Sequence, residues 1–217
     1  DTLPMSVSFV SAIPAPTLVD GQTIVWENVG QTPGELAVNE SGIITLGVRI
    51  SVTSSLLDPA TLRGTILNAA QISTLTPETD GEDNQNDWST DLFIAPARIM
   101  GYVWLDSNAN VVWENSEKPI AGVLVTLSGS DFFSATVLMT TTTDSNGYYS
   151  FGNLKPGSYK ISEGAVAAYA DSGAQLGEVQ IASANNSPGV MQSVNQFTNI
   201  LLAPGNNGVQ FNFAERP

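Results

Sequence analysis

A strand-like run followed by a loop of spaced oxygen ligands occurs at Ile99-Met-Gly-Tyr-Val-Trp-Leu-Asp106-Ser-Asn108-Ala-Asn110-Val-Val112-Trp-Glu114-Asn-Ser-Glu117. Oxygen-bearing side chains fall where the twelve-residue calcium loop of an EF-hand has its ligands, and a backbone carbonyl serves at the seventh position. The predicted Ca²⁺ ligands are the side chains of Asp106, Asn108, Asn110, Glu114 and Glu117, with the carbonyl of Val112. The alternative is a solvated acidic connection between two strands.

The loop departs from the calcium pattern at Val111. Glycine usually occupies this position because the loop turns sharply there. Valine must either avoid the left-handed conformation or adopt it at a cost of ~1 kcal/mol or more. We therefore expect a site that is weakened, distorted or empty compared with a loop that carries glycine.

Short β-rich runs recur along the chain between clusters of Gly, Pro, Asn and Asp, and no window keeps a helical period with proper caps. The clearest run alternates Ile44, Leu46, Val48, Ile50 and Val52 with polar residues, as a half-buried strand requires. Strands are expected at residues 6–11, 23–27, 42–52, 64–74, 88–94, 99–105, 122–128, 134–142, 148–151, 157–163, 194–202 and 208–214. The sequence predicts an all-β protein.

Two connections are distinctive. Asn146-Gly147 lies between two β-rich runs and favours the positive φ angles of a tight hairpin turn. Residues 164–190 are small and polar, and we expect a long loop with one short strand near residues 177–181.

The chain has 217 residues, enough for two domains of about 100 residues each. Ala95-Pro96-Ala97 is a short stiff passage between two strand-like runs, and proline interrupts a strand ladder. We therefore predict one domain at residues 1–96 and a second at residues 97–217.

The composition excludes several classes of function. With 21 acidic and 7 basic residues, the net charge of −14 repels nucleic acid and anionic membrane surfaces and favours divalent cations. The absence of histidine removes the commonest general base, and the absence of cysteine removes disulfides and thiolate metal sites. No apolar run approaches the ~20 residues of a membrane span, and nothing resembles a signal peptide. Neither an enzyme nor a membrane-inserted protein is expected.

Two further groups of residues are candidate sites. Four carboxylates just before Trp88 would repel one another less around a second Ca²⁺, although a solvated turn explains them as well: Asp80, Glu82, Asp83 and Asp87. Five aromatic residues could form a carbohydrate-stacking platform, although core packing is the favoured interpretation: Tyr102, Trp104, Trp113, Tyr148 and Tyr149.

Five ordered blocks of the second half resemble a known family. They are Gly101-Tyr-Val-Trp-Leu-Asp106-Ser-Asn108, Pro119-Ile-Ala-Gly-Val-Leu-Val-Thr-Leu127, Thr143-Asp-Ser-Asn-Gly-Tyr-Tyr-Ser-Phe151, Leu154-Lys-Pro-Gly-Ser-Tyr159 and Phe211-Asn-Phe213. Together they resemble the serine-aspartate-repeat B domain, a CnaB-like module of bacterial surface proteins. The resemblance implies a calcium-binding Ig-like or transthyretin-like β-sandwich that serves as a stalk or spacer, with its calcium loop at residues 106–117.

The first half resembles the conserved-repeat Ig-like domain of bacterial and archaeal surface proteins. The similar blocks are Asp1-Thr-Leu-Pro4, Ser8-Phe-Val-Ser-Ala12, Gly42-Ile-Ile-Thr-Leu-Gly-Val-Arg-Ile50 and Asn68-Ala-Ala-Gln-Ile-Ser-Thr74. In that family the Asp-Thr-Leu-Pro block follows the opening strands, whereas here it stands first. We therefore expect either a piece of a longer polypeptide or strands supplied by a neighbouring subunit.

The resulting prediction is two tandem Ig-like or transthyretin-like β-sandwich domains in a non-catalytic, extracellular structural protein. Its expected role is a calcium-stiffened segment or subunit of a bacterial cell-surface filament, sheath, surface layer or adhesin stalk. The expected partners are copies of itself or neighbouring surface-protein domains. The alternative is an adhesin binding module that recognises a glycan or protein of a host or neighbouring cell through its loops.

Overall fold

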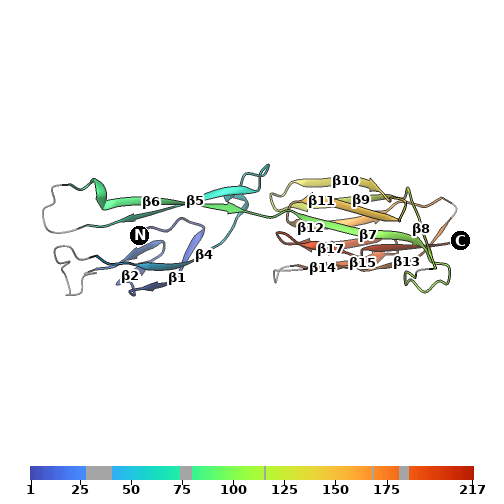
Figure 1. Ribbon diagram of the computed structural model, residues 1–217, viewed down its shortest axis with the longest axis horizontal. Coiled ribbons are helices and arrows are strands. Elements are labelled where there is room, and N and C mark those ends of the chain that lie inside the picture. Colours follow the sequence, from blue (N-terminus) through green and yellow to red (C-terminus); the bar gives the residue numbers. More distant parts are fainter. Residues whose placement is uncertain (28–40, 74–79, 115, 168, 181–185) are drawn as a thin grey trace. The chain divides into compact units, whose positions relative to one another are not determined.

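The computed structural model describes residues 1–27, 41–73, 80–114, 116–167, 169–180 and 186–217. The chain forms two compact units, unit 1 at Asp1–Phe93 and unit 2 at Ile94–Pro217. The expected boundary at Pro96 falls between the last strand of unit 1 and the first strand of unit 2. Apart from strands, the described residues contain two 3₁₀ turns, η1 at Ser54–Leu56 and η2 at Glu82–Asn84, and no helix of theirs could cross a membrane. The all-β prediction is confirmed (Figure 1).

The described residues of unit 1 contain three antiparallel strand pairs. They are β1 (Val7–Ile13) with β4 (Thr45–Ile50), β2 (Leu18–Asp20) with β3 (Thr23–Val25), and β5 (Arg63–Gln71) with β6 (Gln85–Phe93). Thr2 forms bridges to both Thr23 and Ala69, so it joins β3 to β5. The described core of the unit is small and consists of Leu3, Val7, Ile24 and Ile66, with Phe9, Trp26, Leu46 and Leu92 packed against it.

The alternating face predicted around β4 is largely uncovered. Leu46 packs against the core, but Ile44, Val48, Ile50 and Val52 are each 37–43% exposed. The alternation of apolar residues is therefore as predicted, but the prediction that their face is half-buried is wrong within the described residues. No layer in that part of the chain covers this face.

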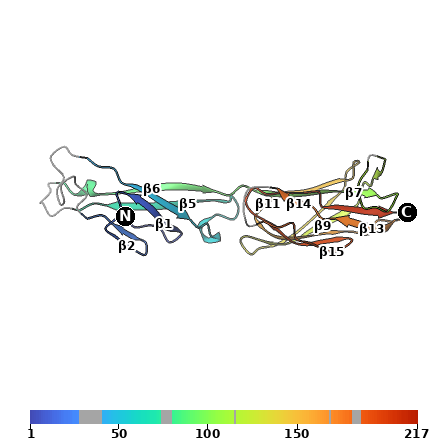
Figure 2. The ribbon, with the colours of Figure 1, turned by 90° about the horizontal axis from the view of Figure 1, so that it is seen from below.

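Unit 2 consists of two sheets that enclose one core (Figure 2). One sheet has the order β10-β9-β12-β16-β15, and the other has β13-β18-β7-β17-β14 with β11 and β8 also paired to β7. Its strands are β7 (Ala97–Leu105), β8 (Lys118–Pro119), β9 (Leu124–Asp131), β10 (Thr136–Thr142), β11 (Tyr148–Leu154), β12 (Gly157–Glu163), β13 (Ala170–Gln175), β14 (Glu178–Gln180), β15 (Val190–Ser193), β16 (Gln196–Leu202), β17 (Asn207–Val209) and β18 (Asn212–Arg216).

The core of unit 2 is rich in aromatic side chains. The rings of Phe197 and Phe213 lie 4.9 Å apart, and Phe197 meets Phe211 edge to face at 5.5 Å. Tyr149 is buried beside Phe151 and Phe213, and its hydroxyl donates to the Phe211 carbonyl at 2.6 Å. Large buried rings of this kind dominate the energetics of a core, so unit 2 has the packing that unit 1 lacks.

The run predicted as one strand at residues 208–214 is split in two. Gly208 of β17 aligns with Ile99 of β7, but Phe213 of β18 aligns with Val103, so one extra residue is inserted between them. Gln210 lies in this bulge with a φ of 59°. Gly101 of β7 permits the close approach, because a Cβ there would overlap the Phe211 carbonyl.

Two connections differ from their predictions. Strand β14 lies where the short strand was predicted near residues 177–181, but residues 164–190 also contain β13, which was not predicted. Asn146-Gly147 forms the expected tight turn, with Gly147 at a φ of 69° and its amide donating to the Asp144 carbonyl at 3.0 Å. However, the turn joins β10 to β11, which belong to different sheets, so the hairpin prediction is wrong.

Candidate calcium site

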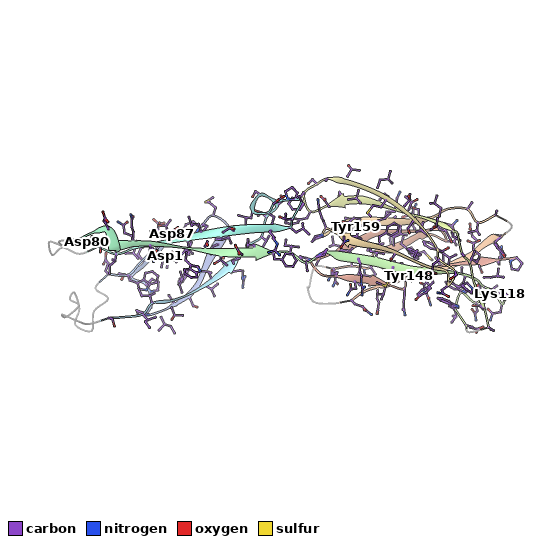
Figure 3. All side chains as sticks on the ribbon, turned by 45° about the horizontal axis from the view of Figure 1, so that its top comes forward. Asp1, Asp80, Asp87, Lys118, Tyr148 and Tyr159 are labelled. Carbon is purple, nitrogen blue, oxygen red and sulfur yellow. The ribbon has the colours of Figure 1, made fainter. Side chains whose placement is uncertain are left out.

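The candidate loop connects β7 to β8 and begins at a fixed point. The Asp106 amide donates to the Glu215 carbonyl at 2.6 Å, which extends the pairing of β7 with β18 by one residue. The loop ends where Lys118 pairs with Leu105. Lys118 is labelled in Figure 3 at the end of unit 2 near the chain's C-terminus. The start of the loop is therefore held by β18 and its end by β7.

Asp106 organises the first turn of the loop from a buried position. Its Oδ1 accepts the amide of Asn110 at 3.1 Å, and its Oδ2 accepts the amide of Val111 at 3.0 Å and the Ser172 hydroxyl at 2.6 Å. Burial raises the pKa of this carboxyl, but hydrogen bonds from Ser172, Val111, Asn110 and Ala109 outweigh burial and leave the pKa below its ordinary value. The anionic form that a cation needs is thus the favoured form.

Glu117 closes the loop on its own beginning. Its Oε1 accepts the Ser107 amide at 2.9 Å, and its Oε2 accepts the Glu114 amide at 3.1 Å. The side chain is buried although the residue lies in a loop. The first and last predicted ligands are therefore both fixed by backbone amides.

Three of the other predicted ligands converge. Asn108 and Asn110 donate their side-chain amides to the two oxygens of Glu114, at 2.9 and 3.2 Å. Their carbonyl oxygens accept the amides of Asn110 and Val112 at 3.2 and 2.7 Å. Each carbonyl oxygen keeps a second lone pair, so these bonds are compatible with a cation ligand.

Val111 adopts the left-handed conformation that glycine usually provides, with a φ of 57°, and Ala109 has a φ of 58°. The loop therefore makes the sharp turn despite valine. The Val111 side chain packs against Gly173 of β13. A Cβ atom added to Gly173 would lie 2.7 Å from a methyl carbon of Val111. This contact partly offsets the cost of the backbone conformation.

The donor set fits calcium better than other metals. No group of three or more Asp, Glu, His or Cys side chains gathers as a metal site in the described part of the chain. The loop instead combines carboxylates with amide oxygens and a backbone carbonyl. Ca²⁺ accepts six to eight such oxygens in flexible geometry, whereas Zn²⁺ prefers nitrogen and sulfur.

The second candidate cluster is dispersed. Asp80 accepts the Glu82 amide at 2.9 Å and so shapes its own turn before η2. Asp87 lies on β6 opposite Ala69, and Figure 3 places it along the strand away from Asp80. The side chain of Asp83 lies outside the described residues. The solvated-turn alternative accounts for the contacts of Asp80.

The five candidate aromatic residues divide into two groups. Trp104 and Tyr149 are buried in the core, as favoured from sequence. Tyr102 and Tyr148 are only partly buried, as is Trp113 of the loop itself, and the ring centroids of Tyr102 and Trp113 lie 4.6 Å apart. The period of β11 separates Tyr148 from Tyr149, but it does not predict that Trp104, on the same face of β7 as Tyr102, is buried beside Trp113.

A buried carboxyl pair was not predicted. Glu163 ends β12 and Glu215 lies on β18, and none of their four carboxyl oxygens has a hydrogen-bond partner among the described residues. Burial, followed by the charges of Glu215 and Asp171, raises the pKa of Glu163 to about 9. Burial and Asp171 raise that of Glu215 to about 7. Tyr159, Ile161 and Glu163 alternate as buried residues of β12, so the strand period could have placed Glu163 inside.

Unit 2 is thus a β-sandwich module with an EF-hand-like loop inserted after a central strand. The SdrD B-like domain family matches residues 97–212, and the chain belongs to this family. Domains of this family occur in bacterial cell-surface proteins and bind Ca²⁺. The resemblance stated for the second half is confirmed. This match gives no support to the resemblance of residues 1–96 to the conserved-repeat Ig-like domain.

Similar proteins include serine-aspartate repeat-containing protein D of Staphylococcus aureus strain Newman, which is 43% identical over 81 residues. Serine-aspartate repeat-containing protein F of Staphylococcus epidermidis is 47% identical over 60 residues. These matches cover 37% and 28% of this chain but only 6% and 4% of the two relatives. Among solved structures, the major plantain pollen allergen Pla l 1 covers 55% of this chain and 94% of its own, with 13% identity and a TM-score of 0.33.

Proposed function

We propose that this chain is a non-catalytic, calcium-stiffened structural segment or subunit of a bacterial cell-surface filament, sheath, surface layer or adhesin stalk. The observation that carries the proposal is the closed loop at residues 106–117, in which buried Asp106 and Glu117 hold both ends and Asn108, Asn110 and Glu114 converge between them. The family match supports the cell-surface location.

The proposed ligands are the side chains of Asp106, Asn108, Asn110, Glu114 and Glu117, with the carbonyl of Val112. Bound Ca²⁺ would supply positive charge to the carboxylates of Asp106, Glu114 and Glu117, which are hard oxygen ligands of the kind that Ca²⁺ prefers. The protein's own part is to tie the end of β7 to β8 through this loop. Since β7 pairs with four other strands, stiffening its end stabilises the seven-stranded sheet.

Removal of calcium tests the proposal. We expect EDTA to lower the melting temperature of the calcium-loaded full chain, because a ligand bound only to the folded state stabilises it. Glu117→Gln should weaken calcium binding by at least about tenfold in calorimetric titration, a loss of about 1.4 kcal/mol. The control is Glu178→Gln, an exposed glutamate of β14. An unchanged melting temperature in EDTA would refute a structural calcium site.

Unit 1 supports a second part of the proposal, assembly through strand addition. Within the described residues, β6 pairs with β5 alone, and nearly all its side chains are exposed on both faces. An edge strand of this length is a template for another strand. We propose that copies of this chain or neighbouring surface-protein domains supply that strand.

The net charge supports the remaining expectations of this role. An excess of 14 negative charges opposes contact with nucleic acid and with anionic lipid. The proposed partners are proteins, and the family match supports a proposed place of work at the cell surface.

A further inference from the structure

A groove opens on unit 2 next to the candidate calcium loop. Calcium binding by the loop does not require this groove. It is an open groove with a volume of about 440 Å³, lined by Tyr102, Val112, Trp113, Gln175, Gln210 and Asn212. Its volume lies within the range of small-molecule sites. None of the six lining side chains carries a charge, although the chain as a whole is strongly acidic.

The aromatic wall of the groove is held by neighbouring rings. Trp113 lies nearly parallel to buried Trp104, with an interplanar angle of 11° and centroids 6.1 Å apart. Tyr102 lies between Trp113 at 4.6 Å and Tyr148 at 5.3 Å, and both of these ring pairs are tilted by 58°. Trp113 and Tyr102 remain partly exposed. The wall therefore presents aromatic surface whose orientation is set before any ligand arrives.

The floor of the groove is a chain of amides. Buried Asn212 accepts the Tyr102 backbone amide through Oδ1 at 2.9 Å and donates Nδ2 to Gln175 Oε1 at 3.0 Å. Gln175 is thereby oriented, and its own NH₂ group stays available as a donor. Gln210 reaches the groove from the bulge between β17 and β18, where its φ is 59°. A non-glycine residue in this conformation is strained, and such strain is concentrated at functional sites.

We propose that this groove binds a neutral carbohydrate, with a sugar ring stacked on Trp113 and Tyr102 and its hydroxyl groups bonded to Gln175 and Gln210. A sugar ring offers an apolar C–H face to the aromatic wall and hydroxyl groups to the amides, which both donate and accept. A purely apolar ligand would leave the amides unpaired. An anionic sugar would meet the negative field of the chain. Because Val112 and Trp113 belong to the loop at residues 106–117, the inference rests on the closed conformation of that loop, but it does not depend on assembly.

The test uses the full chain in calcium-containing buffer and ¹H–¹⁵N correlation spectra. The probes are four neutral disaccharides: cellobiose, lactose, mannobiose and N,N′-diacetylchitobiose. We expect at least one to cause saturable shifts at the amides of the groove, with a dissociation constant on the order of 1 mM, equivalent to about 4 kcal/mol. Trp113→Ala should weaken this binding about tenfold or more, a loss of about 1.4 kcal/mol.

Two further variants separate binding from folding. Gln210→Gly keeps the backbone conformation, since glycine tolerates a positive φ, and it should also weaken the binding. Tyr169→Ala removes an exposed aromatic side chain of unit 2 outside the groove and should leave binding unchanged. Shifts that survive both Trp113→Ala and Gln210→Gly would overturn the proposal. So would an absence of shifts with all four sugars, or equal binding of 3′-sialyllactose or of an uncharged peptide.

Discussion

Glu163 and Glu215 are the residues of unit 2 whose positions are hardest to reconcile with a stable core. They come from opposite sheets, both are buried, and their carboxyl oxygens lack hydrogen-bond partners in the described part of the chain. Burial, together with the charges of Glu215 and Asp171, raises the pKa of Glu163 to about 9. A protonated glutamic acid is thus the stable form in the folded state at neutral pH.

The raised pKa predicts that stability falls with rising pH. The folded state holds a proton that the unfolded chain releases above the ordinary glutamate value of 4.5. The associated stability is complete below about pH 4.5 and is lost progressively as the pH rises towards 9. In EDTA, we expect the free energy of unfolding to decrease between pH 5 and pH 8.5, by at most about 1.4 kcal/mol per pH unit for each of the two protons that Glu163 and Glu215 hold.

Glu163→Gln should reduce this slope and stabilise the protein above pH 7, because glutamine stays neutral in both states. Glu215 should account for the slope that remains below about pH 7. Urea denaturation at pH 5, 7 and 8.5 measures the effect. The exposed Glu178→Gln is the control and should retain the wild-type slope. Equal slopes for Glu163→Gln and wild type would contradict the prediction.

At the scale of single residues, the sequence predicts features within one loop but not contacts between distant parts of the chain. The spacing of oxygens from Asp106 to Glu117 predicted a loop of ligands, and in the structure Glu117 accepts the Ser107 amide within that loop, ten residues away. The hydrogen bond from Ser172 to Asp106 joins residues 66 positions apart, and no spacing rule could provide it. The packing of Val111 against Gly173 could not be predicted from the sequence for the same reason.

Strand β13 is the element that supports the loop from outside it. Ser172 donates to Asp106, and Gly173 makes room for Val111. The sequence around this strand is small and polar, which is typical of a loop, so it was assigned to one. Pairing with β18 overrides that local preference, as tertiary context often does in sheets.

Gly173→Ala should displace the loop. The added methyl group would lie 2.7 Å from a methyl of Val111, and such overpacking costs about 1–3 kcal/mol. In a Val111→Gly background the same change should cost much less, because the obstructing methyl groups are gone. Gly152→Ala is the matched control, since a Cβ on Gly152 meets nothing within 4 Å. Additive costs in the double-mutant cycle would show that the two residues do not interact.

Strand β6 carries the prediction of strand addition. Trp88 is 76% exposed in the middle of this strand, which is unusual for so large an apolar side chain. If copies of the chain pair through this edge, Trp88→Lys should shift the sedimentation profile towards monomer, because an added charge on an edge strand opposes pairing. Met5→Lys adds the same charge at a residue of unit 1 that lies outside any strand and should have no effect. Concentration-independent monomers of wild type would exclude self-pairing and leave a neighbouring domain as the partner.

For the whole molecule, the two units differ in how much apolar surface they bury. The described core of unit 1 rests on four side chains, Leu3, Val7, Ile24 and Ile66. In unit 2 both sheets contribute, and the centre contains Tyr149, Phe151, Phe197, Phe211 and Phe213. The class of fold followed from turn residues and β-rich runs. The difference in buried apolar surface could not be predicted from the sequence. Both units contain alternating strands, and only the presence of a covering sheet decides which residues are buried.

This difference predicts two separate thermal transitions in the full chain. Unit 1 should melt first, since a small core cannot offset the conformational entropy of its strands. Unit 2 should melt at higher temperature, and only its transition should move with calcium, by about 2.7 kcal/mol at a concentration one hundred times the dissociation constant. Differential scanning calorimetry in excess Ca²⁺ and in EDTA measures both transitions. Glu117→Gln should abolish the calcium-dependent shift of the upper transition and leave the lower one in place. A single transition, or a calcium shift confined to the lower one, would mean that the stability of the chain is not divided between the units in this way.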